Sequence, residues 1–219
     1  MTKTNCLVII FSMILLLASC RGQSNKNSTS SEDKVAIGKS DNARIELTAL
    51  IRQVYEWHMT KRIDDFPYKY EEPADTLIMG IDWEKYNNNI EVFKQTNFFS
   101  RDFFTRHKNI ALTLDTSIKK ADKEWRNIND GIPLWATNAD DWCGCQDYPD
   151  NYWEKLTIHD LNIINDFASF YWSWDEPVKS DSFKYKMTAK KEDDKWKINS
   201  IEGFDNYYSV EHYDKLMNK

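Results

Sequence analysis

The period of the hydrophobic pattern changes near Pro149, and this change limits the chain to few fold classes. Before that proline, apolar residues recur at intervals of three and four, which is typical of amphipathic helices. After it, apolar and polar residues alternate, most clearly in SFKYKMTAKK at 182–191, which indicates strands with one dry and one wet face. Helices followed by an antiparallel sheet predict an α+β fold in which the N-terminal helices pack on one face of the sheet.

Four strands are expected in the second half of the chain, close enough in sequence to form a meander. They cover residues 155–164, 166–175, 182–191 and 195–204. Glu192-Asp193-Asp194 supplies a polar turn between the last two strands. A short helix near 209–217 closes the expected order of elements.

Two amphipathic helices are expected before the sheet. The first covers 42–62 with Asp41-Asn42 as its N-cap, and the second begins at Ser100 and continues to about 121. The apolar face of the first helix consists of Leu47, Leu50, Ile51, Val54, Tyr55 and His58. Residues 127–150 carry glycines and prolines and are expected to be irregular.

The first twenty residues predict where the protein resides. Lys3 is followed by an apolar run that is too short to span a bilayer comfortably, which is typical of a secretory signal. Its end, Leu17-Ala18-Ser19-Cys20, resembles a bacterial lipobox, which implies cleavage after residue 19 and a diacylglycerol on Cys20. The alternatives are a secreted protein with a chance cysteine at the cleavage site, or an uncleaved anchor.

The remaining chain divides into a polar tether and one domain. Residues 20–40 contain little to bury and predict a flexible tether, and 41–219 has the length of a single domain. The net charge of −6 disfavours binding to nucleic acid and to anionic lipid headgroups. Attachment to the membrane is therefore expected to depend on the lipid on Cys20. Because Arg21 is not an acidic retention signal, the expected location is the outer membrane of the cell envelope, facing either the periplasm or the surface.

Four short motifs stand out along the chain: Tyr55-Glu56-Trp57, Phe99-Ser100, Cys145-Gln146-Asp147-Tyr148 and DDKWKINSI at 193–201. Together with the order of elements, they resemble a family of bacterial lipoproteins that carry a domain of unknown function with a cystatin-like or NTF2-like fold. The resemblance covers roughly residues 43–204. It implies a cone in which helices wrap a curved half-barrel sheet, with a pocket open at one end. The superfamily includes isomerases, dehydratases, transport factors and proteins without activity, so the fold alone does not give a function.

Cys143-Gly144-Cys145 is the most unusual local motif. Cys6 lies in the signal and Cys20 is expected to be acylated. Cys143 and Cys145 therefore carry the only thiols that remain in the mature domain. Disulfides persist outside the cytoplasm, and a bond between Cys143 and Cys145 is the simplest pairing. Such a bond either stabilises the loop without any chemical role or takes part in redox chemistry. In the third interpretation, the two cysteines are unpaired thiols.

A ligand pocket is the first of two candidate sites. If the cone is present, the first helix lines it, and the candidate lining residues are Tyr55, His58, Trp172, Trp174 and Tyr185. His58 could exchange a proton with a ligand, together with a carboxylate such as Asp147. The ordinary interpretation is that His58 and the aromatic residues fill the core between helix and sheet.

The loop at 127–153, which contains the irregular segment, is the second candidate site. An exposed aromatic patch there would indicate a partner surface, and its candidate residues are Trp142, Gln146, Asp147, Tyr148 and Trp153. The acidic residues of this segment are Asp140, Asp141, Asp147 and Asp150, but their spacing does not match a calcium loop, and no second ligand pair completes a zinc site. The sequence therefore predicts neither a metal nor a cofactor.

The function that these patterns favour is that of a lipid-anchored binding or interaction module. The partner is a protein, as for a toxin-neutralising immunity protein, or a small ligand in the cone. No nucleophile elbow, S-x-x-K motif or phosphate-binding glycine loop is present, which disfavours covalent hydrolysis and phosphoryl transfer. The alternative is an enzyme of isomerase or dehydratase type that uses His58 and a carboxylate.

Overall fold

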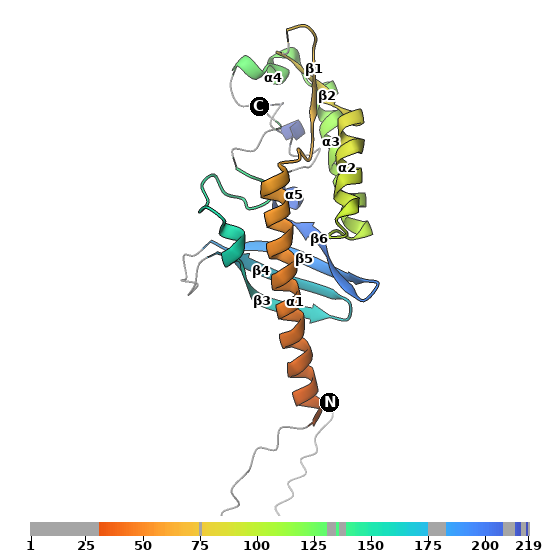
Figure 1. Ribbon diagram of the computed structural model, residues 1–219. Helices are drawn as coiled ribbons and strands as arrows, with labels where there is room; N and C mark the ends of the chain where they lie inside the picture. The colour runs from red at the N-terminus through yellow and green to blue at the C-terminus, as the bar shows by residue number, and fades with distance from the viewer. Residues whose placement is uncertain are drawn as a thin grey trace, which may run out of the picture.

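The computed structural model describes residues 31–74, 76–130, 135, 139–174, 183–207, 213–215 and 218, with the backbone only at 31–40, 130 and 205–207. Its helices are α1 (Ser31–Lys61), α2 (Trp83–Gln95), α3 (Arg101–Lys120), α4 (Lys123–Arg126) and α5 (Glu202–Tyr207). Two 3₁₀ turns, η1 (Ile128–Asp130) and η2 (Tyr152–Lys155), lie between α4 and the main sheet. The expected α+β class is confirmed: helices pack against antiparallel sheets (Figure 1).

The main sheet is the predicted meander. Its strands β3 (Thr157–Ile164), β4 (Phe167–Ser173), β5 (Tyr185–Glu192) and β6 (Lys195–Ile201) pair antiparallel in the order β3-β4-β5-β6. The turn between β5 and β6 places both Asp193 and Asp194 at positive φ, as a two-residue hairpin turn requires. A second, two-stranded sheet of β1 (Tyr68–Tyr70) and β2 (Ile78–Ile81) was not predicted, because each strand is too short for an alternation to show.

The helix α1 crosses the sheet and covers its apolar face (Figure 1). The predicted face of α1 is confirmed, since Leu47, Ile51, Val54 and Tyr55 are all buried. The buried residues of β4, β5 and the start of β6 alternate as predicted and include Ala168, Phe170, Trp172, Tyr185, Met187, Ala189, Trp196 and Ile198. The alternation predicted for the end of β6 is wrong, because Asn199 and Ile201 are buried as well as Ser200. The core therefore lies between α1 and the sheet and continues toward α3.

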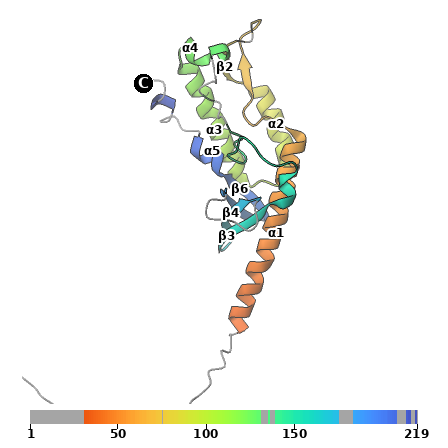
Figure 2. The same ribbon diagram turned by 90° about the vertical axis from the view of Figure 1, so that its left-hand side faces the viewer.

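The start of α1 differs from the prediction. The helix begins at Ser31, so residues 31–41, most of them assigned by sequence to the tether, are helical. Glu32, Lys34 and Ala36 have high helix propensity, and a packed helix extends readily into such a segment. Figure 2 shows that this N-terminal part of α1 projects beyond the sheet.

The two middle helices differ in how well the sequence predicted them. α3 follows its prediction, and the Ser100 hydroxyl accepts a hydrogen bond from the Phe103 amide at 3.1 Å. α2 was not predicted, because its two buried residues, Tyr86 and Phe93, are a full seven positions apart and three asparagines separate them. Of the expected helix at 209–217, only residues 213–215 lie within the described part, and they are helical.

The main sheet does not form the curved half-barrel that the family resemblance implies. Among the described strands, β3 to β6 form an open sheet that neither closes nor curls (Figure 1). Four strands are too few to close even a small barrel. The sheet ends at β3 on one side, and on the other side Ile198 of β6 forms backbone hydrogen bonds with Phe98 and Ser100. The pocket described below consequently lies beside the sheet rather than inside it.

The free edge of β3 is protected by α1. Arg44 and Arg52 of α1 donate hydrogen bonds to the carbonyl oxygens of Ile158 and Leu156, at 2.5 and 2.9 Å. The register of β3 also shifts between His159 and Asn162, which indicates a bulge. Both features are common ways to prevent the pairing of an edge strand with another chain.

Within the described residues, no helix is both long enough and apolar enough to traverse a bilayer.

Candidate functional site

A pocket of about 300 Å³ lies where the C-terminal end of α1 meets two segments without regular structure. The first segment follows α1 directly, and the second is the tight turn at 139–145. The lining residues are His58, Ile63, Asp64, Asp65, Phe66, Tyr68, Trp135, Asp140, Asp141 and Trp142. Carboxylates and aromatic rings thus make up most of the wall.

The first wall is set by the end of α1. The helix stops at Lys61, and Arg62 adopts a left-handed conformation that turns the chain back toward the core. The carboxylate of Asp64 then accepts a hydrogen bond from the Phe66 amide at 3.1 Å, which fixes the direction of the segment. As a result Asp64 and Asp65 both face the pocket while Phe66 is buried.

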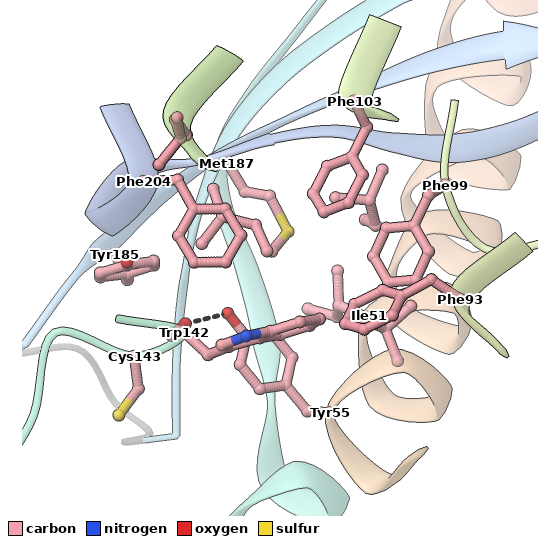
Figure 3. Close-up of a cluster of buried hydrophobic side chains, with 14 of the residues drawn as sticks. Ile51, Tyr55, Phe93, Phe99, Phe103, Trp142, Cys143, Tyr185, Met187 and Phe204 are labelled. Carbon is pink, nitrogen blue, oxygen red and sulfur yellow. Dashed lines mark hydrogen bonds between the residues drawn. The ribbon is translucent and has the colours of Figure 1, made fainter. Parts of the chain in front are cut away.

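Trp142 forms the second wall and connects the pocket to the core. Its side chain is only 1% exposed, and Figure 3 shows its indole between Tyr55 and Phe204. The Tyr55 hydroxyl donates a hydrogen bond to the Trp142 carbonyl oxygen, drawn as a dashed line in Figure 3. The His58 ring stacks on the indole with a centroid distance of 4.0 Å. Trp142 is therefore held on both faces and by its backbone.

A chain of partly and fully buried hydrogen bonds runs from Trp142 into the core below the pocket. The Trp142 indole N–H donates to Oδ2 of Asp65 at 2.7 Å, and Oδ1 of the same carboxylate lies 3.1 Å from Nε2 of His107. The other ring nitrogen of His107 lies 3.0 Å from the Tyr86 hydroxyl. His107 is buried, so its polar atoms depend on these partners. Asp65 thereby joins the pocket wall to α3 and α2.

His58 and Asp140 form the second polar pair at the pocket. Nε2 of His58 lies 3.9 Å from Oδ2 of Asp140. Burial opposes the charged form of Asp140, but His58 and the backbone amides of Trp142 and Cys143 outweigh it, so the pKa of Asp140 lies below its ordinary value. This carboxylate is therefore ionised at neutral pH.

The turn that carries Asp140, Asp141 and Trp142 is tightly bonded. The Asp140 carbonyl oxygen accepts from the Gly144 amide at 2.7 Å, and the Asp140 amide donates to the Cys145 carbonyl oxygen at 2.9 Å. A disulfide joins Cys143 and Cys145. Gly144 has φ +60°, and a Cβ at this position would lie 2.8 Å from Cε2 of Tyr185, so the turn requires glycine.

The charge of the pocket wall is negative. Four of its residues are aspartates and, among the residues that line it, none is lysine or arginine. Lys85 approaches Asp64 from outside at 3.9 Å. Partial burial raises the pKa of Asp64 above its ordinary value although Lys85 lowers it. The negative wall can therefore attract a cationic group.

The residues that the sequence assigned to a ligand pocket are brought together, but mostly as core. Tyr55, Trp172, Trp174 and Tyr185 pack in one aromatic cluster, with the rings of Tyr55 and Trp172 4.8 Å apart. Of the five candidates, His58 alone lines the pocket. Its carboxylate neighbour is Asp140, whereas Asp147 is exposed and does not line the pocket.

The residues of the expected interaction loop are divided between the core and the surface. Trp142 is not at the surface, contrary to the expectation of an exposed aromatic patch, because the turn inserts it beneath His58. Trp153 is half-buried against Tyr152, while Gln146, Asp147 and Tyr148 are exposed. Cys20, the expected lipidation site, lies outside the described residues.

Sequence reasoning did not identify Asp64, Asp65 and His107 as parts of one site. Asp64-Asp65 and Asp140-Asp141 are both Asp-Asp pairs, but the long separation between them gives no local signal of contact. For the described residues, no group of three or more His, Cys, Asp or Glu side chains is placed to hold a metal ion.

No protein-family model, curated protein or solved structure matches the chain.

Proposed function

We propose that the protein is a lipid-anchored binding module of the cell envelope whose acidic, aromatic pocket takes a positively charged group of its partner. The observation that carries this proposal is the pocket at the end of α1, with four aspartates and the ring of Trp142 in its wall. A volume of about 300 Å³ is at the lower end for ligand sites and suits one ammonium or guanidinium side chain better than a large ligand.

The rigidity of the pocket supports binding as its role. Trp142 is held by Tyr55, His58 and Asp65, so its ring is already in place before a ligand arrives. A preformed wall reduces the entropy cost of binding. The partner of an envelope protein with this pocket is a protein with an exposed Lys or Arg, or a small cationic molecule; an immunity-type complex belongs to the first class.

The relationship to NTF2-like or cystatin-like lipoproteins remains part of the proposal. It is supported by the order of elements, with helices preceding a four-stranded antiparallel meander. In this proposal the sheet supports the pocket from the side instead of enclosing it as a cone.

Binding can be tested with N-acetyl-arginine amide as the probe and its neutral isostere, N-acetyl-citrulline amide, as the matched control. We expect calorimetry to detect the arginine probe alone. Asp140→Asn should weaken binding by about five- to tenfold, because it removes one charged contact. Asp147→Asn removes the same charge from an exposed position outside the pocket and should leave the affinity unchanged. Equal binding of both probes would refute the proposal.

The pH dependence of probe binding gives a second check. Attraction requires ionised carboxylates, so affinity should fall as the pH is lowered. The raised pKa of Asp64 makes it the earlier group to protonate, and the lowered pKa of Asp140 makes it the later one. In Asp140→Asn, the affinity should therefore no longer fall over the most acidic part of the pH range, where Asp140 takes up its proton in the wild type.

An acid–base enzyme is the second candidate function, and the His58–Asp140 pair favours it. Both side chains line the pocket, so both can reach a bound molecule. Their separation of 3.9 Å exceeds a hydrogen bond, and the His58 ring is engaged in stacking on Trp142. For this reason the binding function comes first.

Lipid attachment is tested by growth with a labelled fatty acid. We expect the label on the intact protein and in the membrane fraction, and its loss in Cys20→Ala, because the thioether to Cys20 is the proposed anchor. Cys6→Ala is the matched control and should keep the label, since Cys6 belongs to the removed signal. A Cys20→Ala protein that still carries the fatty-acid label would contradict lipidation at Cys20.

A further inference from the structure

The two cysteines of the Cys143–Cys145 disulfide differ in their exposure to solvent. Cys143 is completely buried, next to Trp142, whereas Cys145 is partly exposed. Attack on a disulfide by a thiolate requires access to the sulfur that is attacked. An external thiol can therefore approach the disulfide from the side of Cys145 but not from that of Cys143.

The disulfide is expected to contribute little to the stability of the folded protein. It closes a ring of only three residues, and the entropy that a disulfide removes from the unfolded chain grows with the size of its loop. Without the disulfide, the backbone hydrogen bonds between Asp140 and both Gly144 and Cys145 still connect the ends of the turn, so the turn becomes looser but does not unfold. Reduction of the bond can thus leave the fold intact, as reversible redox chemistry requires.

We propose that Cys143–Cys145 is a redox-active disulfide that exchanges with external thiols through Cys145, and that its reduction loosens the turn carrying Trp142. A thiolate attacks Sγ of Cys145, the bond between the two cysteines breaks, and Cys143 leaves as a thiolate that takes a proton from water. A second reductant thiolate then displaces Cys145 from the mixed disulfide. Two thiols are oxidised to one disulfide, and the protein receives the two electrons.

The reductant class follows from the surroundings of the bond. Asp140 and Asp141 belong to the same turn, and Asp147 follows Cys145 by two residues. Negative charges near the attacked sulfur repel anionic thiols and attract cationic ones, and salt weakens both effects. The site therefore favours a thiol that carries a positive charge. None of this depends on a ligand in the pocket, so the proposal stands apart from the proposed binding function.

The test uses the full chain and the tryptic peptide 127–155, which contains Cys143 and Cys145 but neither Cys6 nor Cys20. The protein is treated with dithiothreitol without denaturant, alkylated and analysed by mass. We expect two labels on this peptide, Cys145 modified about tenfold faster than Cys143 because of its exposure, and full recovery of the bond with oxidised dithiothreitol. Hydrogen exchange should increase at 139–145 while the near-ultraviolet circular dichroism keeps its folded form.

Two further measurements make the proposal falsifiable. Cysteamine should reduce the bond faster than 3-mercaptopropionate at low salt, after each rate is divided by that thiol's rate with neutral hydroxyethyl disulfide, and salt should remove the difference. In the matched variants, the thiol left by Cys143→Ser should react faster than the one left by Cys145→Ser. A bond that is reduced only in denaturant, or whose reduction unfolds the protein, would show an inert structural clip and overturn the proposal.

Discussion

Replacing Trp142 with alanine is expected to destabilise the protein by about 3–5 kcal/mol, which is the usual cost of removing a buried tryptophan. The side chain is 1% exposed and packs against Tyr55, His58 and Phe204. Its loss leaves a cavity beneath the pocket and deprives Asp65 of a hydrogen-bond donor. Urea denaturation followed by far-ultraviolet circular dichroism measures this change.

Tyr148→Ala is the control for this variant. Tyr148 is an aromatic residue of the same segment, but it is 39% exposed and contacts Tyr152 with a ring distance of 5.1 Å, so the expected change is about 1 kcal/mol, well below that of Trp142→Ala. Equal denaturation midpoints for the two variants would show that Trp142 does not pack as described. The burial of Trp142 also means that Trp142→Ala reports on folding, so surface recognition by this segment has to be tested with Gln146 or Tyr148.

Replacing Asp65 with alanine is expected to cost about 3 kcal/mol, although a single small side chain is removed. The carboxylate accepts from the Trp142 indole at 2.7 Å and contacts Nε2 of His107 at 3.1 Å. Both partners are buried, so neither gains water in exchange for the lost contact. The loss should appear as a lower urea midpoint with an unchanged slope.

Two substitutions control for the effect of charge. Asp65→Asn keeps an oxygen that can accept a hydrogen bond from one partner. Its free energy of unfolding is therefore expected to lie between those of the wild type and Asp65→Ala. Asp147→Ala removes an exposed carboxylate and should change stability by less than about 0.5 kcal/mol. If Asp65→Ala were as stable as Asp147→Ala, the buried chain from Trp142 to Tyr86 would not contribute to folding.

The sequence predicted the elements whose local pattern is strong. Strands β3 to β6, the apolar face of α1 and the cap of α3 at Ser100 lie where the alternation, the helical spacing and the capping residue placed them. Each of these signals reports on one element and its exposure to water. The same local reasoning missed α2, in which three consecutive asparagines weaken the apolar pattern, and the strands β1 and β2.

The candidate site was only partly predictable. His58 and the unusual turn around Cys143 and Cys145 were recognised from the sequence, but as separate features. Trp142 was expected outside because aromatic residues in an irregular segment are hard to bury. It is inside because the turn between Asp140 and Cys145 directs it toward Tyr55 and His58.

By itself, the sequence determined the α+β class, the order of the main strands and the lipobox-like start of the chain. These depend on the spacing of apolar residues and on short motifs, which are properties of neighbouring positions. Only the tertiary structure decided that Asp64-Asp65 and Asp140-Asp141 share one pocket and that His107 supports it from below. Contacts between residues far apart in the chain depend on how whole elements pack, and the separate segments carry no record of that packing.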